Sequence, residues 1–275
     1  MARDHPTPFG VDSERPSTAR IYDYFLGGKD NYRADRDAAE QMMAAVPESV
    51  ATVQSNRAFL YRAVTFLARE AGITQFLDVG SGLPTQLNVH QVAQNAAPNA
   101  RVVYVDYDPS VRAYGDVLLS TSENVRFALQ DLRQPSEILA DPAVAELIDL
   151  EKPVAILLIA ILPFISEADD PDEIVAQLRA AMAPGSYLVI SHILDDPRAQ
   201  AIAATQRHAR THPWTPRTKS RIASFFGDFD LVEPGLTMAS QWRPELAAAE
   251  DGFAQAGAGT PDAVNWLLAG VGQKR

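Results

Sequence analysis

Short apolar stretches alternate with longer amphipathic or well-capped stretches along most of the chain. Five apolar stretches have the length and the β-branched content of buried strands: residues 75–79, 101–106, 125–129, 154–162 and 186–192. The stretches between and after them predict helices at 88–95, 109–120, 170–183, 198–212 and 218–226. Two final strands are predicted at 228–232 and 263–271. Strands that alternate with helices predict an α/β fold, in which a mostly parallel sheet carries helices on both faces.

The region before the first strand has a different character. Residues 1–18 are polar and rich in proline, so we expect a flexible arm there. Two helices are predicted next, at about 32–45 with Asp30 or Asn31 as the cap, and at about 56–71 with Ser55 as the cap. Because no linker separates these helices from the first strand, we expect residues 19–72 to form a helical cap. This cap and residues 73–275 would then make one globular unit.

Composition excludes several classes of protein. The formal net charge of −11 leaves no basic excess with which to bind nucleic acid or an anionic membrane. The chain has no cysteine and only five histidines, so we expect no metal site. The longest apolar run, residues 154–165, is far shorter than the roughly 20 residues of a membrane helix. We therefore predict a soluble, cytoplasmic protein, whose oligomeric state the sequence does not fix.

A glycine turn follows the first predicted strand. Gly80, Ser81 and Gly82 precede a predicted helix, as in turns that let the backbone approach a nucleotide closely. The spacing lacks the third glycine of a dinucleotide fingerprint, and Pro84 interrupts the amides that would hold a pyrophosphate. Both features favour a ligand without a pyrophosphate; the alternative is a purely structural turn.

Acidic residues end three successive predicted strands. Asp106 is placed to accept hydrogen bonds from ribose hydroxyls, with Tyr107 against an adenine face. Asp131 would accept from the adenine amino group and the Leu132 amide would donate to a ring nitrogen, unless Asp131 only forms a turn. Asp78, inside an apolar strand, either faces a cation or accepts from the turn amides. This negative nucleoside site suits the sulfonium cation of S-adenosylmethionine (SAM) better than NAD.

Several motifs resemble a known enzyme class. Residues 77–82, 105–109 and 131–132 resemble the first three motifs of class I SAM-dependent methyltransferases. The chain is also similar to a bacterial family in three longer blocks, at residues 20–31, 56–60 and 76–85. Shorter matches extend this resemblance, at residues 184–188 with 191–192 and at 232–236 with 242–244. That family was catalogued as a domain of unknown function and later named S-adenosyl methyltransferase.

The resemblance implies a Rossmann-like fold with a seven-stranded sheet, a reversed last strand and a helical N-terminal cap. It also implies SAM as cofactor, S-adenosylhomocysteine (SAH) as product and no metal, but it names no acceptor. One departure is Pro163, where the family pattern often has a histidine.

Methyl transfer from a sulfonium needs alignment of donor and acceptor and sometimes removal of a proton. The acceptor is expected under the cap, near the apolar end of the fourth strand, where Ile159 would contact the cofactor and Pro163 and Phe164 the acceptor. The Asp/Asn-Pro-Pro-aromatic signature of base methylation is absent, which favours a small-molecule acceptor.

Further side chains complete the predicted site. His192 is the candidate base, whereas His90 is expected to be structural. Lys29 or Arg57 would pair with the methionyl carboxylate. Aromatic residues would line the acceptor side or merely pack in the core: Tyr22, Tyr24, Tyr32, Trp214 and Trp242. We therefore predict a SAM-dependent methyltransferase; the alternatives are a SAM- or nucleoside-binding protein without turnover and, less favoured, a nicotinamide-dependent oxidoreductase.

Overall fold

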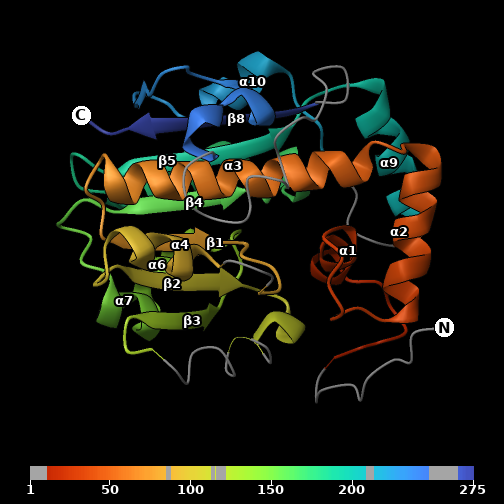
Figure 1. Ribbon diagram of the computed structural model, residues 1–275, viewed down its shortest axis with the longest axis horizontal. Helices are drawn as coiled ribbons and strands as arrows, with labels where there is room; N and C mark the ends of the chain where they lie inside the picture. Colours follow the sequence, from red (N-terminus) through yellow and green to blue (C-terminus); the bar gives the residue numbers. More distant parts are fainter. Residues whose placement is uncertain (1–10, 85–87, 113–114, 116–121, 209–213, 248–265) are drawn as a thin grey trace.

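Five parallel strands form the centre of the protein (Figure 1). The computed structural model describes residues 11–84, 88–112, 115, 122–208, 214–247 and 266–275. The strands lie in the order β3-β2-β1-β4-β5 and have the bounds β1 Gln75–Val79, β2 Arg101–Asp106, β3 Val125–Leu129, β4 Ala155–Ile159 and β5 Tyr187–Ile193. The predicted parallel sheet is confirmed. β4 ends earlier than predicted because Ala160, with φ of 52°, leaves the extended conformation.

Antiparallel strands complete the other edge of the sheet. β8 (Leu267–Gln273) pairs antiparallel with β5, and both β6 (Asp230–Leu231) and β7 (Thr237–Met238) pair with β8. The expected reversal of the last strand is therefore confirmed. Among the described residues the sheet has eight strands rather than seven, because β7 is a two-residue strand too short to leave a pattern in the sequence.

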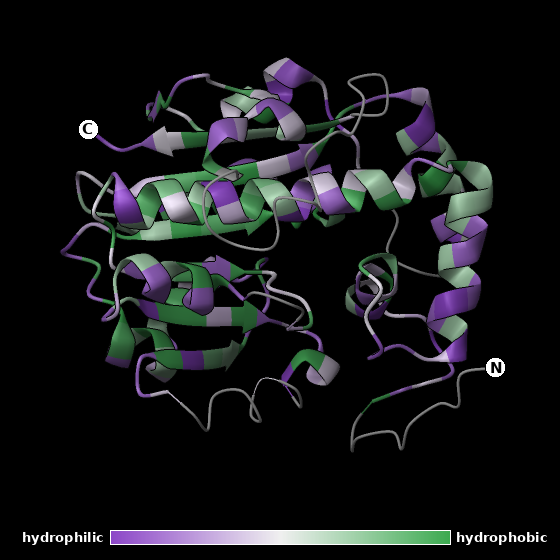
Figure 2. Cartoon of the chain, viewed as in Figure 1, coloured by the Kyte–Doolittle hydropathy of each residue, from purple (hydrophilic) through white to green (hydrophobic). Residues whose placement is uncertain are grey.

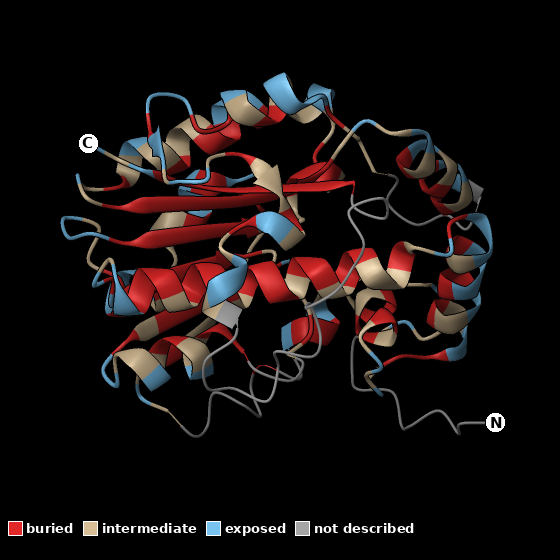
Figure 3. Cartoon of the chain, turned by 45° about the horizontal axis from the view of Figure 1, so that its top comes forward, coloured by how far each residue is buried: buried red, intermediate tan, exposed pale blue. Residues whose placement is uncertain are grey.

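Alternate residues of each strand belong to two separate hydrophobic clusters. Phe76 and Leu157 lie in one cluster, and their neighbours Leu77 and Leu158 lie in the other. Helices α3 (Ser49–Arg69), α4 (Val89–Ala96) and α9 (Pro197–His208) contribute to the first cluster. The second includes residues of α6 (Pro135–Ala140), α7 (Pro142–Leu147), α8 (Pro171–Ala181) and α10 (Lys219–Ser224). Both faces of the sheet are therefore covered, and its central strands β1, β4 and β5 are almost wholly buried (Figure 3).

Helix α3 runs along the sheet and presents a largely buried, apolar face to it (Figures 1 and 2). It begins at Ser49, so the predicted cap residue Ser55 is instead buried inside the helix. The rings of Phe59 and Phe66 meet Trp242 edge to face, with centroids 5.4 and 5.9 Å apart. Arg62 Nε donates to the Trp242 carbonyl at 2.8 Å. Trp242 is thus a packing residue.

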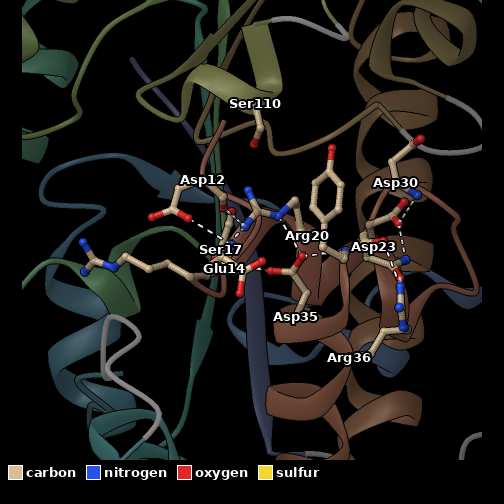
Figure 4. A network of polar contacts seen from close by, with 12 residues as sticks. Asp12, Glu14, Ser17, Arg20, Asp23, Asp30, Asp35, Arg36 and Ser110 are labelled. Atoms are coloured by element: carbon tan, nitrogen blue, oxygen red, sulfur yellow. Dashed lines mark hydrogen bonds and ion pairs between the residues drawn. The ribbon is translucent and has the colours of Figure 1, made fainter. Parts of the chain in front are cut away.

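Two helices lie beyond the carboxyl ends of the parallel strands: α1 (Thr18–Phe25) and α2 (Arg33–Ala45) (Figure 1). A buried ion pair joins them, with Arg20 Nε 2.8 Å from Asp35 Oδ2 (Figure 4). Asp35 also accepts from the backbone N–H groups of Ser17 and Tyr32, at 2.8 Å each. The prediction of Asp30 or Asn31 as the helix cap is therefore wrong: Tyr32 occupies the cap position, and the Asp35 side chain satisfies its amide.

The remaining predicted elements differ mainly in their ends. The predicted helices at 170–183, 198–212 and 218–226 correspond to α8, α9 and α10, whereas α1, α6 and α7 were not predicted. Residues 1–10, most of the predicted helix 109–120, the end of 198–212 and the Ala-Gly-rich segment 248–259 lie outside the described residues. Part of the expected flexible arm is anchored, because Arg20 donates to the carbonyls of Asp12 and Arg15. Single-turn 3₁₀ segments complete the described chain: Leu162–Phe164, Glu167–Asp169, Ala239–Gln241 and Pro244–Ala247.

Candidate functional site

The glycine turn after β1 is held against the end of β2. The amides of Gly80 and Ser81 donate to the Val105 carbonyl at 2.7 and 3.1 Å, and the Gly82 amide donates to Asp106 Oδ2 at 2.9 Å. Gly80 and Gly82 have φ of 74° and 66°, which explains the choice of glycine. At Gly80 a side chain is also excluded by space, because a Cβ atom would lie 2.5 Å from Ile161.

Two of the predicted acids lie side by side at the strand ends. Asp78 falls on the same face of β1 as Phe76, and burial raises the pKa of its carboxyl to about 7. Asp106 ends β2, and burial raises its pKa to about 6, against the opposing effect of hydrogen bonds from the Asp108 and Gly82 amides. Both carboxyl groups are therefore poised to ionise near neutral pH when a positive charge arrives.

A cavity opens between these strand ends and helices α1 and α3; we call it the strand-end cavity. Four carboxyl groups and one guanidinium line it, which makes its wall predominantly negative. The lining residues are Thr18, Ala19, Tyr22, Asp23, Arg57, Leu60, Asp78, Gly80, Ser81, Gly82, Leu83, Asp106, Tyr107, Asp108, Ile159, Ala160, Ile161 and Phe164. Ser81 Oγ is buried without a hydrogen-bond partner among the described residues, and so can bind a ligand.

A smaller pocket adjoins the strand-end cavity beyond β2 and β3. Tyr107, Asp131 and Leu132 line it, and it shares Gly80, Asp106 and other wall residues with the larger cavity. The structure thus brings these predicted nucleoside contacts to one place. Asp131 is already engaged there, because Arg133 Nε lies 3.0 Å from both of its carboxylate oxygens.

Charged residues of the helices face the glycine turn across the strand-end cavity. Arg57 lies in α3, where its Nε donates to the Tyr61 hydroxyl at 2.8 Å. Asp23 lies in α1 and accepts from Asn31 Nδ2 and the Asp30 amide (Figure 4). The turn after α1 wraps this carboxylate so tightly that a Cβ atom on Gly28 would overlap it. Arg57 was predicted, whereas Asp23 was missed, although the Gly27-Gly28 pair marks the turn that encloses it.

A second, apolar cavity lies beside the first. It is lined by Thr18, Ile21, Tyr22, Phe25, Met42, Ser49, Thr52, Val53, Asn56, Ala160, Phe164, Ile193, Ile202, Gln206, Trp214, Trp266 and Leu267. Thr18, Tyr22, Ala160 and Phe164 line both cavities. Of the aromatic residues predicted for the acceptor side, Tyr22, Phe164 and Trp214 therefore reach a cavity.

The prediction of His192 as a base is wrong. Its side chain is fully buried and lines neither cavity, because residues alternate along β5 and Ser191 is the one that faces α3. His192 Nδ1 bonds to the Ile193 carbonyl and Nε2 to Arg217, at 2.8 and 2.9 Å. Burial lowers the pKa of His192 to about 3, so the ring stays neutral at physiological pH.

Four other candidates do not line either cavity. Lys29 is exposed in the turn after α1, so Arg57 alone of the two cations faces the glycine turn. Tyr24 packs against the hydrophobic cluster, and the ring of Tyr32 lies beneath Arg20 at 5.3 Å. Pro163 is buried and uses its carbonyl to accept from the Thr215 amide. His90, for which we expect a structural role, bonds through Nδ1 to the Tyr104 hydroxyl at 2.9 Å.

Within the described ranges, no group of three or more His, Cys, Asp or Glu side chains is arranged to hold a metal ion. No helix of the described chain combines the length and the apolarity needed to cross a membrane.

Replacing Gly80 with alanine is expected to weaken ligand binding in the strand-end cavity at least tenfold, because the new Cβ atom must displace Ile161 and with it the cavity wall. Gly72→Ala is the matched control. Gly72 has a similar φ of 69° but open space around it, so only the backbone strain of about 1–2 kcal/mol should appear there. Calorimetric titration of both variants would test this, and equal affinities would show that Ile161 yields freely.

Comparisons with known proteins identify the family of the chain. The family model described as S-adenosyl methyltransferase matches residues 4–275. A crystal structure of a candidate methyltransferase from Thermobifida fusca YX is 41% identical, with a TM-score of 0.89 and 98% of each chain covered. A DUF574 family protein from Streptomyces avermitilis MA-4680 is 35% identical, with a TM-score of 0.88, over 96% of this chain and 99% of that one. A search of curated proteins gave no match. From the match over almost its whole length, the chain belongs to the S-adenosyl methyltransferase family, whose members are SAM-dependent methyltransferases of Rossmann-like fold.

Proposed function

We propose that the strand-end cavity binds SAM and that the apolar cavity binds a small-molecule methyl acceptor. The observation that carries this proposal is the wall common to both cavities, formed by Thr18, Tyr22, Ala160 and Phe164. Ligands that fill the two cavities meet at this wall, beyond the end of β4. Holding two reactants in line in this way supplies on the order of 7–11 kcal/mol toward a bimolecular reaction.

The side chains of the strand-end cavity fit each part of SAM. Asp106 is the ribose contact, and Tyr107, Asp131 and Leu132 lie on the adenine side. Arg57 suits the methionyl carboxylate and Asp23 the amino group, since opposite charges pair best where burial excludes water. When bound, SAM supplies a methyl group activated by a positively charged sulfur. Asp78 and Asp106 face that charge as carboxylates.

The acceptor cavity lacks an obvious base. Among the described residues that line it, only the Tyr22 hydroxyl titrates, and burial raises the pKa of that hydroxyl further. The described residues of this wall therefore contribute alignment and exclusion of water rather than proton abstraction. A small molecule fits this apolar cavity, whereas the net charge of −11 disfavours nucleic acid.

Calorimetry with SAM, SAH and NAD is the direct test of the cofactor. We expect binding of SAM and SAH, and none of NAD; tight binding of NAD alone would overturn the proposal in favour of a nicotinamide enzyme. Incubation with methyl-labelled SAM and a fractionated cell extract then separates an enzyme from a binding protein. Label in the small-molecule fraction supports the proposal, and label confined to nucleic acid contradicts the acceptor class.

The affinity for SAM is expected to rise roughly fivefold from pH 6 to pH 8. The pKa of Asp78 is about 7 without ligand, and only its ionised form attracts the sulfonium. The affinity for SAH, whose sulfur is neutral, should change less with pH. In Asp78→Asn, the affinities for SAM and SAH should no longer differ in their pH dependence. The stability of the ligand-free protein should follow the opposite trend, because folding raises the pKa of Asp78. The contribution of Asp78 to the free energy of unfolding is fully present below about pH 4, and it is lost as the pH rises through 7. A SAM affinity that is independent of pH would show that Asp78 lies away from the sulfonium.

A further inference from the structure

The walls of the apolar cavity define a chemical class for the acceptor. We infer that the acceptor is an uncharged, single-ring aromatic compound bearing an oxygen substituent, and that the Tyr22 hydroxyl anchors that oxygen beside the methyl donor. The inference rests on the proposed function and makes the acceptor side of it specific. In the transfer, a lone pair of the acceptor forms the bond to the methyl carbon, the carbon–sulfur pair stays on sulfur to give SAH, and any proton on the attacking atom leaves to water.

The cavity wall favours a neutral ring. No charged side chain of the described residues lines it, so an ion would lose its hydration without gaining a partner among them. Five aromatic side chains contribute to the wall: Tyr22, Phe25, Phe164, Trp214 and Trp266. Trp214 meets Trp266 with ring centroids 5.8 Å apart and Phe164 with centroids 6.4 Å apart, at inclined angles of 50° and 72°. Inclined rings of this kind present edges and faces against which another ring packs favourably.

The cavity volume limits the size of the ring system. It is about 70 Å³, which is less than the roughly 150 Å³ of an engineered apolar cavity that holds benzene. The junction with the strand-end cavity adds room at one side only, through Tyr22, Ala160 and Phe164. Because even one ring needs more room than this, the ring must extend into the junction with its substituent, and a fused ring system would not fit.

A chain of hydrogen bonds orients one polar group of the wall, the Tyr22 hydroxyl. The Ala160 amide donates to Ser191 Oγ at 2.9 Å, and the Ser191 hydroxyl donates to Asn56 Oδ1 at 2.6 Å. Asn56 Nδ2 then donates to the Tyr22 hydroxyl oxygen at 3.0 Å. The direction is set at Asn56, because its Oδ1 can only accept and its Nδ2 can only donate.

Tyr22 ends this chain as a donor. Since its oxygen already accepts from Asn56, its hydrogen must point onward, and the Val53 carbonyl is its partner at 3.4 Å, which is long for an O–H donor. An acceptor oxygen within the cavity can replace that long bond with a better one. Tyr22 lines both cavities, so an oxygen held there lies at the junction. Tyr22 is thus a positioning residue for the acceptor.

The test is a calorimetric titration of four single-ring compounds into the full chain, with and without saturating SAH. Phenol and toluene have nearly the same shape and differ in the hydroxyl, whereas benzoate and benzylammonium carry a charge. We expect phenol to bind about fivefold more tightly than toluene, which is the effect of one hydrogen bond of about 1 kcal/mol, and both ions not to bind. Tyr22→Phe keeps the ring and should abolish the preference for phenol while leaving toluene unchanged. Trp214→Ala should weaken both neutral compounds equally.

The outcomes separate this inference from the proposed function. If SAH binds but an ion binds as tightly as phenol, the inference is overturned and the proposed function stands. The same holds if Tyr22→Phe leaves the ratio of phenol to toluene affinity unchanged. If the neutral rings bind with the expected Tyr22 dependence but SAH does not, the aromatic cavity is supported and the proposed function is overturned.

Discussion

Replacing Asp106 with alanine is expected to weaken SAM binding by about a hundredfold without unfolding the protein. Asp106 ends β2, is 7% exposed and lines both the strand-end cavity and the adjoining pocket. Its two oxygens accept from the Gly82 and Asp108 amides, which fixes the carboxylate toward the cavity. Hydrogen bonds from both ribose hydroxyls to an ionised carboxylate are worth about 1.5 kcal/mol each, and together they correspond to roughly a hundredfold change in affinity.

Adenosine and the variant Arg57→Ala provide the matched controls for this prediction. Asp106→Ala should weaken adenosine and SAM alike, because both carry the ribose. Arg57→Ala should weaken SAM, which has a carboxylate, and leave adenosine unchanged. Calorimetric titration measures all four affinities, and the circular dichroism of each variant checks the fold. If Asp106→Ala binds SAM as tightly as the unmodified protein, Asp106 is only a turn residue.

The residues that we propose for the nucleoside side could be placed together from the sequence, because they are local to strand ends. Gly80 follows β1, Asp106 ends β2 and Asp131 follows β3, and β1, β2 and β3 are parallel neighbours. Parallel strands bring their carboxyl ends to one edge of the sheet, so strand assignment alone placed these residues together. β1 and β2 were clear in the sequence because most of their residues are buried and apolar.

The apolar cavity, which we propose as the acceptor side, was predicted only in part, through Tyr22, Phe164 and Trp214, because long-range packing of helices builds it. Asn56 and Ser191 are 135 positions apart in the chain and meet only where α3 crosses β5. Asp23 faces the strand-end cavity because the Gly27-Gly28 turn folds around it, a result that helical periodicity does not reveal. His192 was misassigned for a related reason. Its place at a strand end suggested a catalytic role, but the face of β5 on which it lies was decided by its neighbour Ser191.

A second large effect is expected from breaking the ion pair between α1 and α2. In Asp35→Asn, the buried Arg20 guanidinium loses its charged partner, and an amide N–H group must face one of the three donors that Asp35 now accepts from. Removing one member of a buried pair costs about 3 kcal/mol or more. The control is Asp37→Asn, because Asp37 pairs with Arg33 at 3.6 Å on the surface, where the side chains are 58% and 83% exposed. Its effect should stay below about 0.5 kcal/mol.

Hydrogen exchange measures whether this energy holds the helices over the site. The backbone amides of α1 and α2 should exchange on the order of a hundredfold faster in Asp35→Asn than in Asp37→Asn, because exchange follows the free energy of local opening. The affinity for SAM should also be lower in Asp35→Asn, since α1 supplies Thr18, Tyr22 and Asp23 to the strand-end cavity. Ser17 links the ion pair to the cavity directly. The Ser17 amide donates to Asp35, and the Ser17 hydroxyl donates to Asp108 Oδ2 at 2.5 Å, on the opposite wall of the cavity. Faster exchange with unchanged SAM affinity would mean that SAM itself orders these helices; unchanged exchange would mean that packing against α3 and α9, rather than the ion pair, holds them in place.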